Sequence, residues 1–348
     1  MKAKIAWLEF LRFALSILIA LFIGYVFLLF GTKNPSEAFK WFLYGPISTQ
    51  RRFVEFLNNA VPLMFTGLSL CLVFQAKIFN IGAEGQFFFG AFGAMLIALT
   101  FPAISWIHLL LTLLGAALFG AAWAFVPAWL KTRWKASELV SSLMMNYISY
   151  LLVLFLVNNY FRDKAAGALV SYRFPQTAWL ATLTRFRLNS GLFVAVGVVI
   201  VIGLLVYRTK FGYEIRAMGA NKKFAFYSGI NVSHVMFWVQ ILAGAIAGLA
   251  GGIEISAMYR RFVWQSFPGY GFDGIVVAII ARNNPFLVIP SAFFIAYLRV
   301  GANIMGRLTG IAPEVVIVLQ SIMILLITAE ALLAKFKQRI IEREAMKE

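Results

Sequence analysis

Cysteine and histidine are nearly absent from this chain of 348 residues. The single cysteine, Cys71, lies within an apolar run, so no disulfide within the chain is possible. The two histidines, His108 and His234, stand alone beside the ends of apolar runs, where an interfacial role is more common than a ligand role. We therefore predict no metal site in this chain.

Charged residues are also scarce, and acidic ones most of all. Asp, Glu, Lys and Arg make up 13% of the chain, whereas an ordinary soluble domain has about 25%. Hydrophobic residues make up 61%, and 31 Lys and Arg outnumber 14 Asp and Glu. The basic residues lie in loops between long apolar runs, which favours contact with anionic lipid headgroups and topology control over nucleic-acid binding. The composition predicts an integral membrane protein that has membrane lipid as a partner and binds no nucleic acid.

Three motifs that mark nucleotide-binding or catalytic proteins are missing: GxxxxGK[ST], HExxH and GxSxG. No other set of residues replaces them, so we predict no catalytic residues, no cofactor in this chain and no enzyme activity. If the chain moves a solute, the energy must come from an ion gradient or from another subunit.

Long apolar runs fill most of the sequence. Because a membrane-crossing helix needs about 20 mainly apolar residues, we predict an all-α membrane protein with about ten spans in a single domain, residues 1–348. The expected spans are 10–30, 54–75, 81–99, 106–130, 137–157, 190–207, 233–256, 272–281, 285–300 and 313–333, the eighth and ninth being short.

The distribution of Lys and Arg gives a weak preference for a cytoplasmic N-terminus. In that orientation residues 31–53 and 161–189 form exterior loops. Spans two to five and seven to ten then enter the membrane from opposite sides, an order that is typical of an inverted repeat.

The most polar interruption is the basic stretch 208–232, whose core is Gly212–Val232. Its apolar and charged residues alternate at helical spacing, with Gly219 between two short segments and Gly229 as a stop signal. We predict a short surface helix against which an external motor can push; an ordinary basic loop is the alternative. The residues expected to seat in a partner's groove are Ile215, Met218, Phe224 and Phe226, with Arg216, Lys222 and Lys223 left in solvent.

A second polar stretch, Asn80–Gln86, opens the third expected span with an amide, the carboxylate of Glu84 and another amide. A buried carboxylate costs several kcal/mol unless it is paired, so Glu84 needs a partner. Either this is a broken helix at a solute pathway or it is a cap that holds the second and third spans together. Asn146 in the fifth span has the same two interpretations, pathway or interhelical hydrogen bonding.

The seventh span carries Gly244, Gly248 and Gly252 at four-residue spacing, which predicts close packing of a neighbouring helix. Glu254 follows and should pair with Arg260 or Arg261.

The connection after the seventh span is rich in aromatic residues. These rings could stack on a flat ligand or form an interfacial belt; they are Tyr259, Phe262, Trp264, Phe267 and Tyr270.

Asp273 opens the eighth span as an N-cap or as a pathway residue. Arg260 and Arg261 are candidates for docking an acidic soluble partner. The candidate pathway residues are therefore Asn80, Glu84, Gln86, Asn146, Phe267, Tyr270 and Asp273.

Four stretches together resemble one family: FNIGAEGQ (79–86), ELVSSLMMNYI (138–148), GYEIRAMGANKKFAFYSGINV (212–232) and FPGYGFDGIVVAIIARNNP (267–285). The sequence is similar to the permease subunits of bacterial nucleoside ABC importers, within the wider group of simple-sugar and branched-chain amino-acid permeases. The first and fourth stretches are specific to the nucleoside group. Lys222 and Lys223 depart from the family, which usually has a small residue and a proline there.

The resemblance implies a multi-pass subunit of the bacterial inner membrane that imports nucleosides. It implies three partners: a second permease subunit, identical or different, an ATPase subunit that binds ATP and Mg²⁺, and an extracytoplasmic nucleoside-binding lipoprotein. It assigns ATPase coupling to Gly212, Glu214, Arg216, Ala217, Gly219, Asn221 and Gly229.

Other functions remain open from the residues alone. A ribose or other simple-sugar importer would need similar amides along its path. A proton-coupled secondary transporter could use Glu84, Glu254 or Asp273 as its proton site, without an ATPase. A purely structural membrane scaffold fits poorly with so many polar residues inside the spans.

Overall fold

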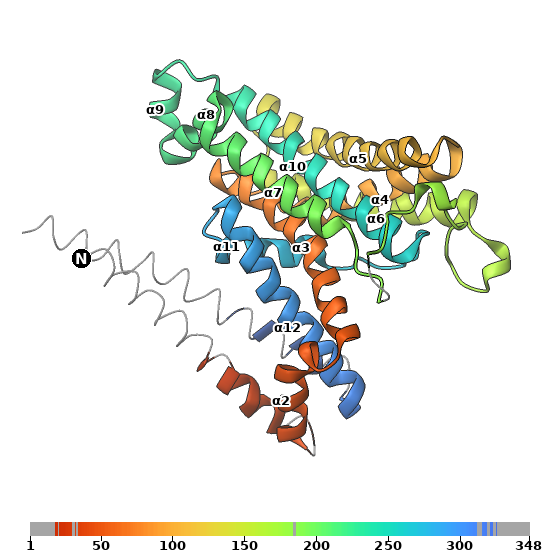
Figure 1. Ribbon diagram of the computed structural model, residues 1–348. Coiled ribbons are helices and arrows are strands. Elements are labelled where there is room, and N and C mark those ends of the chain that lie inside the picture. The colour runs from red at the N-terminus through yellow and green to blue at the C-terminus, as the bar shows by residue number, and fades with distance from the viewer. Residues whose placement is uncertain are drawn as a thin grey trace, which may run out of the picture. The chain divides into compact units, whose positions relative to one another are not determined.

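The computed structural model describes residues 18–19, 21–29, 32, 34–183, 186–311, 315–318, 321–322 and 325, and its regular elements are helices (Figure 1). The α-helices are α2 Pro35–Tyr44, α3 Gln50–Gln75, α4 Ala83–Thr100, α5 Ser105–Trp134, α6 Glu138–Leu156, α7 Gly191–Arg208, α8 Lys210–Ala220, α9 Lys222–Tyr227, α10 Val232–Glu254, α11 Tyr270–Ile280 and α12 Val288–Thr309. Short 3₁₀ or π segments are η1 Gly45–Ile47, η2 Val157–Phe161, η3 Lys164–Ala166, η4 Gln176–Ala178, η5 Ile255–Tyr259 and η6 Pro285–Leu287. The all-α membrane architecture is confirmed.

Seven helices in the described part of the chain are long and apolar enough to cross a membrane. They are Gln50–Gln75, Ala83–Thr100, Trp106–Trp134, Glu138–Phe161, Gly191–Arg208, Val232–Tyr259 and Pro285–Thr309. The eighth expected span is the shorter apolar helix α11, of 11 residues. The first expected span, 10–30, and the last, 313–333, lie largely outside the described residues, so the count of ten stays a prediction.

Two boundaries predicted from hydropathy were wrong. The ninth span does not end at Val300 but continues to Thr309, because Asn303 and Arg307 occupy an exposed face of the helix, where polar side chains do not interrupt it. The expected loop 31–53 instead contains α2. Its Glu37 and Lys40 lower the hydropathy of the segment, so hydropathy did not identify it as a helix.

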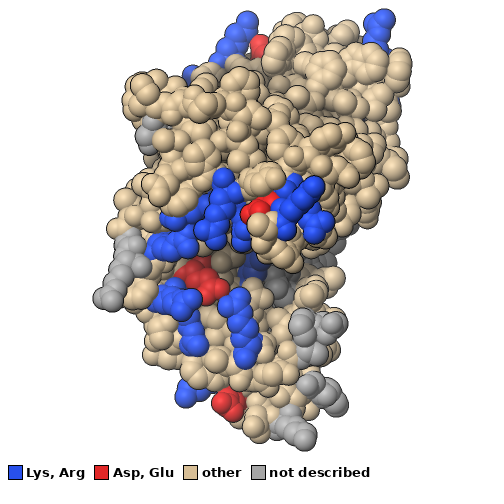
Figure 2. Space-filling view, turned by 90° about the vertical axis from the view of Figure 1, so that its right-hand side faces the viewer, with Lys and Arg blue, Asp and Glu red and all other residues tan. Residues whose placement is uncertain are grey.

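The chain divides into two compact units, Met1–Phe56 with Ala296–Glu348, and Leu57–Ile295. In the larger unit, α4 is mostly buried, whereas most residues of α5, α6 and α7 are at least partly exposed, as in lipid-facing helices. Figure 2 shows one face of the molecule, on which wide uncharged areas separate groups of Lys and Arg side chains. Such uncharged surface is what contact with lipid tails requires.

The core of the larger unit is a packing of α4, α5 and α10, and glycines make its closest contacts. A Cβ placed on Gly90 of α4 would lie 2.2 Å from the Cα of Gly248 on α10, and one on Gly120 of α5 would lie 2.3 Å from the carbonyl oxygen of Gly244. The predicted packing role of the α10 glycines is confirmed, and Gly90 and Gly120 are their partners.

Candidate functional site

The turn before α4 is held by one face of α6. Ser142, Asn146 and Ser149 lie at helical spacing on that face, and all three are buried. Ser142 Oγ accepts from the N–H of Ile81 at 3.1 Å, and Ser149 Oγ donates to the carbonyl of Gly85 at 2.9 Å. Asn146 accepts from the N–H of Gly85 at 2.9 Å and donates to the carbonyl of Ile81 at 3.0 Å. Asn146 is thus a hydrogen-bonding link between α6 and α4, and its place on a solute path stays a prediction.

Buried amides continue this network toward α10. Asn80 Oδ1 accepts from the N–H of Gly82 at 2.7 Å, and its Nδ2 donates to Gln240 Oε1 at 3.1 Å. Gln240 in turn donates to the carbonyl of Met236 at 3.1 Å. Asn80 and Gln86 are each 3% exposed and Gln240 is fully buried. Three helices therefore share one buried polar centre next to the first turn of α4.

Glu84, in the first turn of α4, is fully buried, and its carboxylate accepts hydrogen bonds from the start of α11. Its Oε1 accepts from the N–H of Gly269 at 2.8 Å, and its Oε2 accepts from Gly271 and, at 3.3 Å, from Phe272. The negative charge thus lies at the positive ends of two helix dipoles. The expected partner of Glu84 exists at the start of α11.

Asp273 was predicted as a possible N-cap of the eighth span, and that assignment was wrong. The N-cap is Gly269, whose φ of 82° only glycine adopts easily, and Asp273 is half-buried one turn into the helix. Pattern analysis did not identify the earlier helix start, because the residues before Asp273 are aromatic and glycine-rich and show no helical period. The role of Asp273 in the pathway stays a prediction.

The aromatic connection packs mostly on itself and on α4. Phe88 lies 5.2 Å from Phe262 and 5.4 Å from Phe267, and Phe87 lies 5.3 Å from Trp264 and 5.7 Å from Tyr270, measured between ring centroids. Phe262 is fully buried, while Trp264 and Tyr270 are 8% and 6% exposed. These ring faces are therefore filled by neighbours within the chain, and the most exposed of the five rings is Tyr259, at 41%.

Arg260 and Arg261 lie at the end of η5. The Arg260 guanidinium lies 3.8 Å from the ring centroid of Trp179, and burial and the nearby charge of Arg187 lower its pKa. Arg261 is half-buried. Part of the positive surface that we expected at Arg260 is thus covered by a tryptophan, and the docking role of both residues stays a prediction.

The basic stretch 208–232 contains two helices, α8 and α9, which are separated at Asn221, whereas Gly219, expected between the two segments, lies inside α8. Side chains cap each start: Thr209 accepts from the N–H of Gly212 at 3.1 Å, Asn221 accepts from Lys223 at 3.0 Å and from Phe224 at 3.1 Å, and Asn231 accepts from His234 at 3.1 Å. Gly229 ends the turn after α9 with a φ of 81°. The segment is a pair of capped helices and not an open loop.

Helix α8 packs on its own chain. Ile215 and Met218 are buried, and the Arg216 guanidinium lies 5.4 Å from the ring centroid of Tyr207 on α7. A Cβ on Gly219 would lie 1.9 Å from the carbonyl oxygen of Gln75, the last residue of α3. The prediction that Ile215 and Met218 face a partner was wrong, because the helical period identifies an apolar face but not what covers it.

Helix α9 presents the free apolar surface of this segment. Phe224 is 59% exposed, Phe226 66% and Tyr227 84%, and Lys222 and Lys223 beside them are exposed as well. In Figure 1, α8 and α9 lie together at one end of the larger unit.

Residues 52–328 match the family model described as branched-chain amino acid transport system / permease component. The chain belongs to this permease family. The permease is 32% identical to the glucose ABC transporter permease protein TsgB13 of Haloferax volcanii, over 93% of this chain and 89% of that protein. It is 31% identical to the guanosine ABC transporter permease protein NupP of Bacillus subtilis, over 79% of this chain and 80% of that protein. It is 29% identical to the nucleoside ABC transporter permease protein NupB of Lactococcus lactis, over 91% and 90%.

The protein is therefore a multi-pass inner-membrane permease subunit of an ABC transporter and not an enzyme. It works within a system that also has an ATPase and a binding protein.

Sequence reasoning missed several residues of the permease's polar centre. Ser142, Ser149 and Gln240 were not singled out, although Ser142, Asn146 and Ser149 recur at the helical period and so share one face of a span. Tyr227 was also missed at the exposed end of α9. Polar residues that recur on one face of an otherwise apolar helix were the signal that could have found the serines.

Proposed function

We propose that the permease imports nucleosides delivered by an extracytoplasmic binding lipoprotein, using ATP and Mg²⁺ bound by a separate ATPase subunit. A second permease subunit, identical or different, would complete the path. The observation that carries the substrate class is the contact between the two stretches that resemble the nucleoside group most specifically. Glu84, from 79–86, accepts backbone hydrogen bonds from Gly269, Gly271 and Phe272, from 267–285. The similarity to guanosine and nucleoside permeases supports the same proposal.

Coupling to the ATPase would run through α8 and α9 in different ways. Helix α9 would make the contact, because Phe224, Phe226 and Tyr227 are exposed on it and apolar rings of this kind anchor protein interfaces. Helix α8 would transmit the movement, because Gly219 lies directly against the end of α3 and Arg216 lies over Tyr207 of α7. A displacement of α9 would then move α8, and α8 would transmit the movement to α3 and α7 through these direct contacts. In this proposal Gly212, Glu214, Ala217, Asn221 and Gly229 shape the helix pair.

The α9 contact predicts a specific loss of ATPase recruitment. Replacing Phe224, Phe226 and Tyr227 together by alanine should lower co-purification of the ATPase at least about tenfold, since central interface aromatics contribute roughly 2 kcal/mol or more each. The amount of permease in the membrane should not change, because these side chains are mostly exposed and bury little surface within the chain. Affinity purification of the complex from detergent, with immunoblots of both subunits, measures the ratio.

Phe193→Ala is the matched control, because Phe193 on α7 is 66% exposed, as Phe226 is. It should leave the ratio unchanged. Undiminished recruitment by the triple variant would show that α9 is not the contact.

The substrate proposal predicts a pattern of competition. In proteoliposomes that hold the complete transporter, uptake of labelled guanosine should be reduced by excess inosine and unaffected by ribose, glucose or leucine. In this proposal the binding protein delivers the solute, so the assay must include it. The glucose permease relative favours a second candidate, a sugar importer. Uptake of labelled glucose that guanosine does not reduce would establish that candidate and end the nucleoside proposal.

A further inference from the structure

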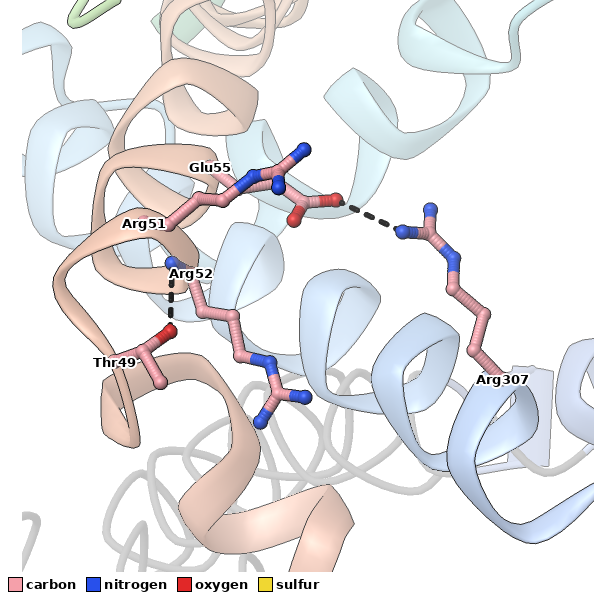
Figure 3. A pocket seen from close by; sticks show the side chains of 5 residues that line it. All are labelled: Thr49, Arg51, Arg52, Glu55 and Arg307. Atoms are coloured by element: carbon pink, nitrogen blue, oxygen red, sulfur yellow. Dashed lines mark hydrogen bonds and ion pairs between the residues drawn. The ribbon is translucent and has the colours of Figure 1, made fainter. Parts of the chain in front are cut away.

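An arginine-lined pocket lies in the smaller unit. It has a volume of about 400 Å³ and is lined by Thr49, Arg51, Arg52, Glu55 and Arg307 (Figure 3). Four of these residues come from the turn before α3 and the start of that helix, and Arg307 comes from the last turn of α12.

The walls of the pocket are fixed by packing within the same unit. Gly45 of η1 lies against Ile304 of α12, and a Cβ at Gly45 would come within 2.9 Å of that side chain. Tyr297 of α12 donates a hydrogen bond to the carbonyl of Leu43, and its ring lies 5.6 Å from that of Phe56. The arginines therefore project from a defined scaffold and not from a loose loop.

The pocket carries an excess of positive charge. Arg307 Nη1 lies 3.6 Å from Glu55 Oε1, and one carboxylate cannot neutralise three guanidinium groups. Arg52 donates to Ser48 Oγ at 2.7 Å and lies 5.3 Å from the ring centroid of Trp41, contacts that orient it without neutralising it. In Figure 3, Arg51 and Arg307 lie on either side of Glu55.

The position of two arginines adds to this imbalance. Arg51 and Arg52 stand in the first turn of α3, a helix of 26 residues, where the helix dipole disfavours cations. A bound anion would relieve both the repulsion among the arginines and the unfavourable dipole interaction. Three guanidinium groups with forked N–H donors are best matched by the oxygens of a phosphate group.

Exposed apolar side chains lie close in sequence to the residues that line the pocket. Ile47 directly precedes it and is 52% exposed, and Phe53, next to Arg52, is 42% exposed. Tyr44 is 51% exposed at the end of α2. A soluble anion would leave these apolar side chains exposed, whereas the acyl chains of a lipid would cover them.

The predicted orientation indicates which leaflet is involved. With a cytoplasmic N-terminus, which the distribution of Lys and Arg favours, residues 31–53 form an exterior segment. The arginines at the start of α3 therefore lie at the outer membrane face. We propose that the arginine pocket binds the phosphate group of an anionic phospholipid of the outer leaflet, with its acyl chains over Ile47 and Phe53.

Native mass spectrometry of the purified full-length chain, titrated with short-chain phosphatidylglycerol, tests this proposal. Phosphatidylglycerol should bind at least about tenfold more tightly than zwitterionic phosphatidylcholine, because each basic residue close to an anionic lipid adds to the affinity. The double variant Arg51→Gln, Arg307→Gln should remove that preference. Glu55→Gln should increase the affinity for phosphatidylglycerol, because it removes the competing carboxylate and leaves the arginines in place.

Arg173→Gln is the control, since Arg173 is an exposed arginine in the loop between α6 and α7. It should bind phosphatidylglycerol as the wild type does. Equal binding of the two lipids by the wild type would overturn the proposal, as would unchanged selectivity in the double variant or weaker binding by Glu55→Gln. Saturation by inorganic phosphate without any lipid preference would replace it with a free-phosphate site. Capture of an acidic extracytoplasmic protein through the same arginines, with no lipid preference, would replace it with a protein-docking site.

Discussion

Replacing Gly248 by leucine should abolish folding of the permease. A side chain at this position would start 2.4 Å from the carbonyl oxygen of Ala116 and 2.7 Å from the Cα of Gly120, both on α5. The backbone of α10 cannot withdraw, because a Cβ on Gly90 of α4 would already lie 2.2 Å from the Gly248 Cα on the other side. Overpacking of a close-packed core costs about 3 kcal/mol or more when backbone must move. Thermal unfolding and size-exclusion chromatography in mild detergent should show loss of the monodisperse species.

Gly197→Leu is the matched control for this prediction. Gly197 is exposed in the interior of α7, and nothing lies within 4 Å of a Cβ placed there. The same substitution should therefore leave the melting temperature unchanged or raise it slightly, since leucine favours a helix over glycine by up to about 1 kcal/mol. A folded Gly248→Leu variant with wild-type stability would mean that α4, α5 and α10 do not meet through glycine contacts.

Glu84→Ala should cause the second large loss. The change leaves the N–H groups of Gly269, Gly271 and Phe272 without their acceptor in a buried region. Hydrogen bonds to a charged group contribute roughly 1.5–3 kcal/mol each, and unsatisfied buried donors add to the cost. We expect a destabilisation of about 4 kcal/mol or more, measured as a lower melting temperature and as faster hydrogen exchange at the start of α11.

Glu37→Ala is the control, because Glu37 also stands in the first turn of a helix but is exposed. It should change stability by less than about 1 kcal/mol. If Glu84→Ala melted as the wild type does but stopped transport, the carboxylate would act on the pathway and not as a cap of α11.

The spans could be predicted because hydropathy is a local signal. Residues 54–75, 106–130 and 190–207 are apolar over most of a membrane thickness, and each lies within a helix that has nearly the same bounds. Helix α2 could not be found in this way, since its 10 residues are too few to span and include Glu37 and Lys40.

The candidate site was predictable in its residues but not in its contacts. Burial of Glu84 predicted that its carboxylate accepts hydrogen bonds from some donor. The donors lie at the start of α11. The sequence does not indicate which backbone N–H groups point toward Glu84. In the basic stretch 208–232, the helical periodicity of the sequence correctly separated apolar from charged positions. It could not show that Ile215 and Met218 are covered by the chain itself while Phe224 and Phe226 stay exposed.

The hydrogen bond between Glu84 and Gly269 also constrains biosynthesis. The two residues are 185 positions apart, so at about 5–20 residues per second the donor leaves the ribosome roughly 10–40 seconds after the acceptor. During that interval the carboxylate must stay hydrated at the membrane surface or be shielded by the insertion machinery. The first turn of α4 can therefore settle into its final place only late in synthesis, when the nascent chain has delivered the start of α11.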